Sequence, residues 1–154
     1  IKAVGETHRL PVIVSTHPRT RKRLEDLGQV DAGPYVRFLK PLGFLDYMQL
    51  QMHARCVISD SGTITEESSI IGFPAITIRN THERPEGMDE GTLVMSGLRS
   101  EHVLKCIEVV LAHHETGRRT FRMVPEYEPD NVSKKVVRII LSYVGYVNRY
   151  TWHR

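Results

Sequence analysis

The chain has 154 residues, 40% of them hydrophobic and 25% charged, so it is long enough for one domain with its own core. Its net charge of +3, from 21 basic and 18 acidic residues that are mostly spread out, argues against a nucleic-acid partner. No apolar run approaches a membrane span, and the chain opens with neither a signal peptide nor an initiator Met. We therefore expect a cytoplasmic piece of a longer protein, without a membrane partner.

Apolar runs alternate with segments of helical periodicity. The predicted strands are 12–15, 36–39, 56–59, 75–78 and 92–95, and the predicted helices are 18–27, 43–53, 62–71 and 100–113. Pro18 suits the first turn of a helix, and Gly28 and Gly72 suit positions just past a helix end. The alternation, with almost continuously apolar strands, predicts an α/β fold with a doubly wound parallel sheet between two layers of helices.

The cysteines fall on elements that are predicted to lie in the core, Cys56 on a strand and Cys106 on the apolar face of a helix. Neither belongs to a CxxC pair or a disulfide framework, so we expect two buried, reduced thiols, as in a cytosolic protein. The histidines lack the spacing of metal ligands. We predict neither a catalytic metal nor a cofactor.

Residues 60–67 are the most informative stretch, because an apolar strand runs into a Ser-Gly-Thr turn that opens a helix rich in Thr and Glu. Free N–H groups, the positive end of the helix dipole and small residues at the turn together favour a bound phosphate. Glu67, further into the helix, is placed to accept ribose hydroxyls. Equally, Ser61 could be a simple helix cap, and these residues alone leave both interpretations open. Glu66 points about 100° away from Glu67 and is expected to be solvated or capping.

Ligands of parallel α/β sheets bind beyond the carboxyl ends of the strands. His17 and the segments 41–44, 61–63 and 80–84 all follow predicted strands. We therefore expect them to lie along one rim of the sheet.

Beyond a linker-like stretch at 115–129, apolar residues recur at helical spacing to about Arg149. This pattern predicts a long amphipathic helix, whose apolar stripe covers either this sheet or another domain. We divide the chain into a nucleotide-binding unit, residues 1–130, and a C-terminal helix, residues 131–154.

Four motifs in chain order carry a family resemblance. They are Ser15 to Thr20, Pro41 to Tyr47, Ser59 to Thr63 with Glu66 and Glu67, and Thr81 to Glu86. Together they resemble the non-hydrolysing UDP-N-acetylglucosamine 2-epimerases over essentially the whole chain. Residues 84–88 and 142–149 are most similar to the branch that makes UDP-N-acetyl-L-fucosamine for capsule and O-antigen.

The resemblance implies the Rossmann-like C-terminal domain of a glycosyltransferase-B arrangement, incomplete at its N-terminus. The family inverts C2 of the sugar by eliminating UDP to give a 2-acetamidoglycal and adding it back to the opposite face. Elimination needs a base for the C2 proton and an electrostatic clamp for the departing diphosphate. Because the family's proton-transferring carboxylates lie in the other domain, this chain would hold the nucleotide, contain no catalytic residue and be inactive alone.

The implied partners are a UDP-sugar, the N-terminal domain and a second copy in a homodimer. The substrate would be UDP-N-acetylglucosamine or the UDP-linked 2-acetamido-2,6-dideoxy-talose. The residues that the resemblance assigns to UDP are Gly43, Phe44, Tyr47, Ser61, Gly62, Thr63 and Glu67. Uracil would lie against the aromatic ring at Tyr47, the diphosphate at the Ser-Gly-Thr turn and the ribose at Glu67.

The same resemblance places His17, Arg79, Thr81 and Arg84 near the phosphates, the interdomain cleft or a regulatory sugar-nucleotide pocket. Each of the two strongest candidates has a structural alternative. His17 could be a satisfied residue at a strand end, and Arg84 could form a local ion pair with Glu83 or Glu86 instead of binding phosphate as a planar fork.

Two other functions fit the same pattern. A nucleotide-sugar glycosyltransferase shares the fold and the contact between Glu and ribose, and would transfer sugar to an acceptor. A non-catalytic α/β interaction domain would use Asp60 and the rim for protein contacts, and UDP would then leave Tyr47 and Ser61 unperturbed.

Overall fold

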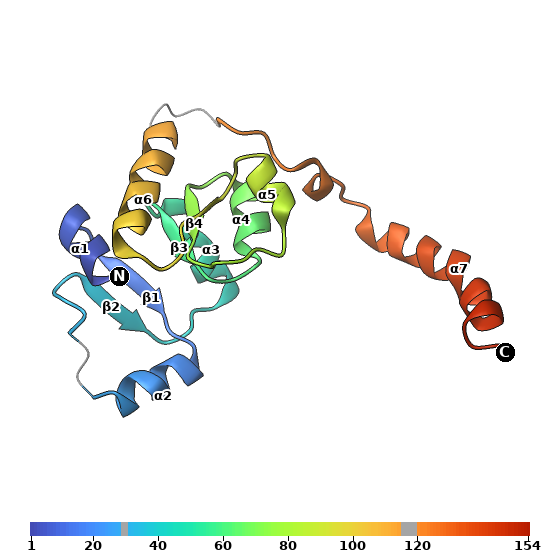
Figure 1. Ribbon diagram of the computed structural model, residues 1–154, viewed down its shortest axis with the longest axis horizontal. Coiled ribbons are helices and arrows are strands. Elements are labelled where there is room, and N and C mark those ends of the chain that lie inside the picture. The colour runs from blue at the N-terminus through green and yellow to red at the C-terminus, as the bar shows by residue number, and fades with distance from the viewer. Residues whose placement is uncertain (29–30, 115–119) are drawn as a thin grey trace.

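A computed structural model of the protein describes residues 1–28, 31–114 and 120–154, in which helices and strands alternate (Figure 1). The elements are α1 (Lys2–His8), β1 (Val12–Ser15), α2 (Pro18–Asp26), β2 (Val36–Leu39), α3 (Phe44–His53), β3 (Val57–Ser59), α4 (Ile64–Ile71), β4 (Ala75–Thr77), α5 (Pro85–Asp89), β5 (Val94–Met95), α6 (Ser100–His114), the 3₁₀ turn η1 (Pro125–Tyr127) and α7 (Val132–Tyr150). The predicted α/β class is confirmed.

The described strands pair in parallel, as the apolar runs predict. Their hydrogen bonds form two ladders, β1-β2 and β3-β4-β5, within this architecture. The β1-β2 ladder is partly open to solvent, because Ile13 and Leu39 remain 41% and 38% exposed. The carboxyl ends of β3 and β4 meet at one edge, where Ser59 pairs with Thr77. The loops that leave these two strands therefore start side by side.

β4 is buried along its whole length and forms the wall between two hydrophobic clusters. Successive side chains of a strand point to opposite faces. Ala75 packs into the cluster that includes Ile64 of α4, and Ile76 into the cluster that includes Ile107 of α6. The three layers of helix, sheet and helix follow from this alternation, with α4 and α6 on opposite faces of β4 (Figure 1).

The ends of α2 and α4 follow local sequence signals. Gly72 adopts a φ of 85° and donates its N–H to the Ser68 carbonyl at 2.9 Å, which closes α4 as predicted. Gly28, with a φ of 75°, lies just past the end of α2 and donates its N–H to the Glu25 carbonyl at 3.0 Å. α4 itself begins at Ile64 rather than at residue 62, because Gly62 and Thr63 form a turn.

The cysteines differ in burial. Cys106 is buried on α6, as predicted, whereas Cys56 lies just before β3 and is partly exposed. Both are free thiols. Desolvation by burial still raises the pKa of Cys56 to about 12, so its thiol is protonated near neutral pH.

The segment before α7 is anchored to α4. Of the predicted linker, residues 115–119 lie outside the described residues. Val124 is fully buried and donates its N–H to Ser69 Oγ at 2.9 Å, and η1 follows it. The part of the linker that the structure describes is therefore packed onto the domain.

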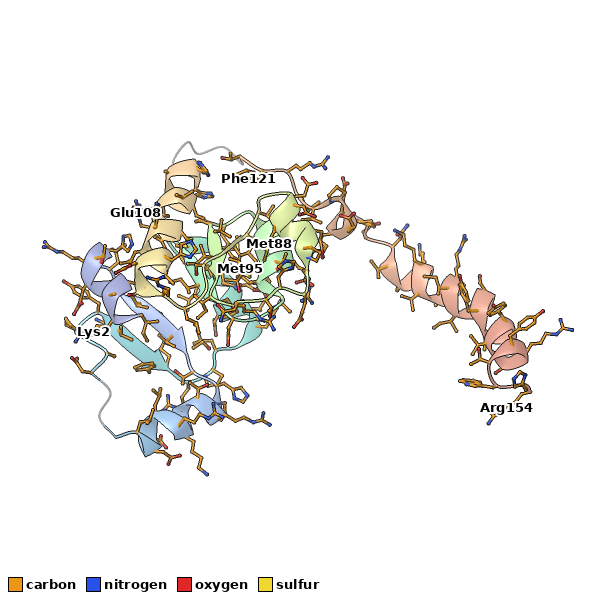
Figure 2. All side chains as sticks on the ribbon, in the orientation of Figure 1. Lys2, Met88, Met95, Glu108, Phe121 and Arg154 are labelled. Carbon is orange, nitrogen blue, oxygen red and sulfur yellow. The ribbon has the colours of Figure 1, made fainter. Side chains whose placement is uncertain are left out.

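α7 matches the predicted C-terminal helix and stands apart from the domain (Figure 1, Figure 2). None of its residues is buried. Its exposed apolar and aromatic side chains are Val132, Val136, Val137, Ile139, Ile140, Leu141, Tyr143, Val144, Tyr146 and Tyr150. The stripe therefore does not cover either sheet of this chain. Within the described ranges, no helix combines the length and apolar character that a bilayer span requires.

Candidate functional site

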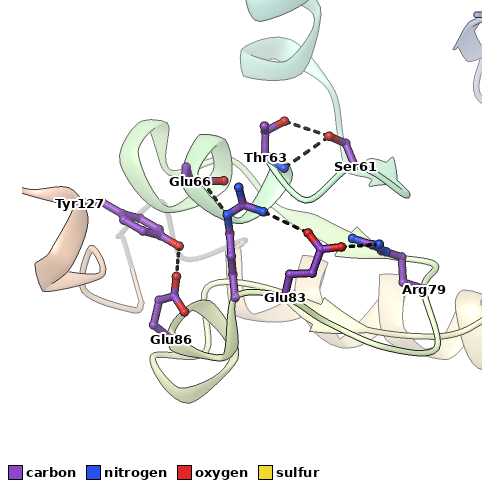
Figure 3. Close-up of polar contacts among 8 residues, drawn as sticks. Ser61, Thr63, Glu66, Arg79, Glu83, Glu86 and Tyr127 are labelled. Atoms are coloured by element: carbon purple, nitrogen blue, oxygen red, sulfur yellow. Dashed lines mark hydrogen bonds and ion pairs between the residues drawn. The ribbon is translucent and has the colours of Figure 1, made fainter. Parts of the chain in front are cut away.

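The turn between β3 and α4 is built from hydroxyl side chains. Ser59 Oγ accepts the Ser61 N–H at 3.1 Å. Ser61 Oγ accepts the Thr63 N–H at 3.3 Å (Figure 3). The hydroxyl oxygens of Ser61 and Thr63 lie 3.0 Å apart, and both residues are exposed at the rim. The simpler interpretation of Ser61 as the helix cap is wrong, because Thr63 is the N-cap residue of α4 and, among the described residues, no side-chain hydrogen bond caps this helix. Ser61 instead closes the turn before the helix, and its exposed hydroxyl and that of Thr63 remain open to a ligand.

Arg84 lies directly over this turn. A Cβ added at Gly62 would collide with the Arg84 Nη1 atom, so the missing side chain at position 62 allows the guanidinium to approach the backbone. Arg84 Nε donates to Glu66 Oε1 at 2.5 Å (Figure 3). The predicted local ion pair of Arg84 therefore exists, but its nearest partner is on α4. The expectation of a solvated or capping Glu66 is wrong, because the segment before α5 folds over this carboxylate.

Glu83 links Arg84 to a second arginine. Arg79 Nη2 donates to Glu83 Oε1 at 2.8 Å, and Glu83 Oε2 lies 3.8 Å from Arg84 Nη1. Glu86, the other predicted partner of Arg84, instead accepts the Tyr127 hydroxyl at 2.6 Å. The rim thus has two arginines next to a turn whose small residues would admit an anion.

Glu67 is held by a buried amide from the neighbouring helix. Gln51 Nε2 donates to Glu67 Oε2 at 2.6 Å, and Gln51 is only 3% exposed. Tyr47, one turn earlier on α3, is half-buried, and its pKa is raised first by burial and then by the Glu67 carboxylate. The structure thus brings together Tyr47 and Glu67, which were predicted separately. Gln51 was missed, although its i, i+4 spacing from Tyr47 places both on one helix face.

The start of α3 presents the predicted aromatic loop. Gly43 is the N-cap residue in an extended conformation, and its carbonyl accepts the Tyr47 N–H at 2.9 Å. Phe44 follows with 75% of its surface exposed. This end of α3 therefore offers backbone groups and a flat apolar ring near the half-buried Tyr47.

His17 lies apart from these contacts, whereas Thr81 lies close to the turn and to Arg84. His17, at the end of the β1-β2 ladder, caps α2 by accepting the Arg19 N–H on Nδ1 at 3.2 Å. Thr81 is exposed and helps to line a hollow of about 10 Å³ that also touches Gly62 and Arg84. That volume has room for about one water-sized group. In the described residues, no three His, Cys, Asp or Glu side chains group together as metal ligands would.

Chemically, the rim pairs cationic groups for an anion with a carboxylate for hydroxyl groups. Arginine forks recognise phosphate oxygens, and helix N-termini add a favourable dipole. Glu67 is fixed by one oxygen to Gln51 and so keeps Oε1 as an acceptor for hydroxyl groups. This arrangement suits a nucleoside diphosphate better than an uncharged ligand.

Comparison with known proteins gives relatives of one kind. A UDP-N-acetylglucosamine 2-epimerase of Methanococcus maripaludis is 31% identical over 124 residues, which are 79% of this chain and 34% of the relative. A second, from Methanocaldococcus jannaschii, is 32% identical over 113 residues, which are 71% of this chain and 31% of the relative. The chain therefore spans about a third of the length of these curated relatives.

Solved structures that resemble this chain carry the same enzyme name as the sequence relatives. The structure of UDP-N-acetylglucosamine 2-epimerase from Rickettsia bellii is 50% identical and matches 98% of this chain and 41% of its own with a TM-score of 0.86. The Methanocaldococcus jannaschii enzyme in complex with UDP-GlcNAc and UDP is 27% identical and matches 90% of this chain and 38% of its own with a TM-score of 0.77.

The family model described as UDP-N-acetylglucosamine 2-epimerase matches residues 1–141. The match includes the turn before α4, the Gln51–Glu67 pair and the arginines of the rim. The family model, the sequence relatives and the solved structures all carry this name, so the chain belongs to the UDP-N-acetylglucosamine 2-epimerase family.

Proposed function

We propose that this chain is the UDP-binding half of an isomerase that epimerises C2 of a UDP-sugar. The observation that carries the proposal is the convergence of Tyr47 from α3, the Ser61 turn and Glu67 from α4, and Arg84 at one edge of the β3-β4-β5 ladder. Family membership and the relative that was solved with UDP-GlcNAc and UDP support it.

In the proposed pose, uracil lies against Tyr47 at the start of α3, with the backbone of Gly43 and Phe44 beside it. The ribose hydroxyls donate to Glu67, whose orientation Gln51 maintains. The diphosphate lies on the turn. Its proposed contacts are Ser61, Gly62, Thr63 and Arg84, with Arg79, Thr81 and His17 as outer residues.

The chemistry asked of this half is electrostatic. Elimination removes the C2 proton and breaks the bond between C1 and the UDP oxygen, which leaves a C1–C2 double bond and a free UDP anion. The turn and the Arg84 guanidinium would stabilise the charge that develops on the leaving diphosphate and hold UDP for addition to the other face. We assign no catalytic acid or base to the described residues, and we expect no turnover by the chain alone.

We further propose that a second domain packs on the apolar stripe of α7. In proteins, most of the stability of a helix comes from packing of its apolar face, and the stripe of α7 covers neither sheet of this chain. The chain also spans about a third of its curated relatives, 34% and 31% of their lengths. That second domain would supply the proton-transferring carboxylates and most sugar contacts, within a cytoplasmic homodimer.

The proposed sugar is UDP-N-acetylglucosamine or its 2-acetamido-2,6-dideoxy-talose counterpart, with a role in capsule or O-antigen synthesis. The support for the second sugar is the resemblance of residues 84–88 and 142–149 to the fucosamine-forming branch. Assay of both sugars with the full-length protein would decide between them.

The experiment that tests nucleotide binding is a titration of the chain with UDP and with uridine, followed by NMR. We expect shifts at Tyr47, Ser61 and Glu67 that are lost in the double variant Ser61→Ala, Glu67→Ala. An absence of shifts at millimolar UDP would contradict the proposal.

A further inference from the structure

We propose that Glu66 is a positioning residue for the diphosphate site. Its carboxylate holds Arg84 by the Nε edge and turns the Nη1 group toward the Gly62 turn. This inference rests on the proposed function, because it explains how one phosphate contact of the proposed UDP site is oriented.

The geometry of the pair carries the inference. Glu66 lies in the first turn of α4 and Arg84 immediately before α5, and Nε donates to Oε1 at 2.5 Å. The two side chains are 30% and 29% exposed, so the pair is shielded from solvent more than an ordinary surface ion pair. A guanidinium held at Nε keeps both Nη groups as donors. One of them, Nη1, lies 2.2 Å from the position that a Cβ of Gly62 would take.

Glu83, the other carboxylate near Arg84, does not fix the guanidinium in this way. Glu83 Oε2 is 3.8 Å from Nη1, beyond hydrogen-bond distance, and the Glu83 side chain is 64% exposed. Its Oε1 is already bonded to Arg79 at 2.8 Å. Glu66 is therefore the group that determines where the guanidinium points.

The second oxygen of the Glu66 carboxylate is not bonded to Arg84. Its Oε2 is buried without a hydrogen-bond partner in the described part of the chain. A buried, unpaired oxygen of a charged group is unfavourable for stability. In the described part of the chain, the bond to Arg84 Nε is the side-chain hydrogen bond that the Glu66 carboxylate makes.

A pre-oriented arginine binds an anion more tightly than a mobile one, because less side-chain freedom is lost on binding. Immobilising one long side chain corresponds to about a three- to tenfold change in affinity. We expect Glu66→Ala to weaken UDP binding by about that factor. Uridine, which has no phosphate, should bind Glu66→Ala and the unaltered chain equally.

Two further variants separate orientation from charge and from folding. Glu66→Gln keeps an oxygen that can accept from Nε and should recover most of the UDP affinity. Glu83→Ala removes the same charge from the other side of Arg84 and should not weaken UDP binding. The NMR signal of the Arg84 Nε–H should move in Glu66→Ala and stay in place in Glu83→Ala.

A double variant tests whether Glu66 acts through Arg84. With Arg84→Ala already present, adding Glu66→Ala should cause no further loss of UDP affinity, since contacting residues are coupled. Equal losses in both backgrounds would overturn the inference. So would a loss of uridine affinity as large as that for UDP, because it would show a general disturbance of α4.

The outcomes distinguish this inference from the proposed function. If the unaltered chain binds UDP and Glu66→Ala binds it equally well, the positioning role is wrong and the UDP site stands. If neither UDP nor uridine shifts any signal of the unaltered chain, the proposed function and the positioning role both fall.

Discussion

Glu67 is oriented by the neutral amide of Gln51, and replacing that amide with a carboxylate tests the contact. Gln51→Glu would place a second carboxylate where the donor now lies 2.6 Å from Glu67 Oε2. Two carboxylates at that distance raise the pKa of the pair, so the native state is disfavoured once both groups ionise. We expect the free energy of unfolding to fall by about 1–3 kcal/mol at pH 7.

Because the native pKa would be raised above its ordinary value, the difference from the unaltered chain should shrink as pH falls through the raised value and vanish below the ordinary glutamate pKa of about 4.3. Urea unfolding at a series of pH values would measure it. Gln49→Glu, at an exposed position of the same helix, is the control and should have little effect. An equal loss for both substitutions would contradict the Gln51–Glu67 contact.

Gly62 is a second test at the scale of one residue. Its φ is outside the left-handed region, so Ala is tolerated by the backbone there, but the new Cβ would displace the end of the flexible Arg84 side chain. We expect Gly62→Ala to change the free energy of unfolding by no more than about 0.5 kcal/mol. UDP affinity should nevertheless fall, as measured by titration.

In a chain that already carries Arg84→Ala, adding Gly62→Ala should leave the UDP affinity equal to that of the Arg84→Ala variant. A further loss there would show that the methyl group blocks the ligand itself rather than moving Arg84.

Sequence patterns predict some of these residues and miss others for physical reasons. Ser61 and Glu67 are signalled by local spacing at a strand–turn–helix junction, which is a short-range property. The Glu66–Arg84 and Tyr127–Glu86 contacts join residues 18 and 41 positions apart, and no short-range pattern contains that information. The assigned roles in UDP binding remain predictions.

At the scale of elements, α4 and α5 meet at a glycine. A Cβ at Gly87 would collide with the Thr65 Cγ2 methyl, and both residues are buried. A buried clash of this kind forces a backbone shift, so we expect Gly87→Ala to lower the free energy of unfolding by about 1–3 kcal/mol. Gly145→Ala is the matched control, because nothing lies within 4 Å of its added Cβ and it sits inside α7.

Gly145→Ala should stabilise the α7 helix by up to about 1 kcal/mol, because alanine has a higher helix propensity than glycine. Denaturation followed by circular dichroism would measure both variants. The packing of α5 on α4 would be wrong if Gly87→Ala proved as harmless as Gly145→Ala.

The contact between η1 and α5 should depend on pH. The pKa of Glu86 is lowered, first by the hydrogen bond from Tyr127, and the pKa of Tyr127 is raised, first by burial and then by Glu86. The contribution of Glu86 is present above its ordinary pKa of 4.5 and is lost as pH falls through the lowered value. The contribution of Tyr127 is present below its ordinary pKa of 10.0 and is lost as pH rises through the raised value.

Tyr127→Phe should therefore destabilise the chain by about 0.5–1.5 kcal/mol between these limits. The difference should fade in acid, which urea midpoints measured across pH would reveal. Tyr143→Phe, at an exposed position of α7, serves as the control. A pH-independent difference would argue against the Glu86 contact.

Element prediction succeeded where the periodic pattern was long. Helices α2, α3, α6 and α7 lie within a residue or two of their predicted ranges. The helices α1 and α5, of 7 and 5 residues, were not predicted, because so few residues contain too little of a helical period. β5 is shorter than expected, since only Val94 and Met95 pair with β4.

At the scale of the whole molecule, α7 contributes an apolar surface without contributing to the described core. A chain that ends at Asp130 should keep the unfolding midpoint of the full chain, because no residue of α7 is buried. The full chain should associate at high concentration through its exposed stripe, and the shortened chain should not. Thermal unfolding and sedimentation velocity would check the two expectations.

A control that keeps the helix is Ile140→Lys with Val144→Lys, which should also abolish association. A midpoint several degrees lower in the shortened chain would show that α7 packs on the domain after all. The apolar periodicity of α7 predicted its existence, but a helix that covers its own sheet and one that covers another domain share the same pattern.

Residues 84–86 combine two attachments within three positions, the arginine over the turn and the carboxylate that accepts Tyr127. Their spacing therefore has to satisfy both at once. Inserting or deleting a single residue in this segment would shift the register of one attachment relative to the other, so neither could be preserved alone. Natural variation in the length of the 79–90 region should accordingly be confined to the two sides of this tripeptide, where no such double constraint acts.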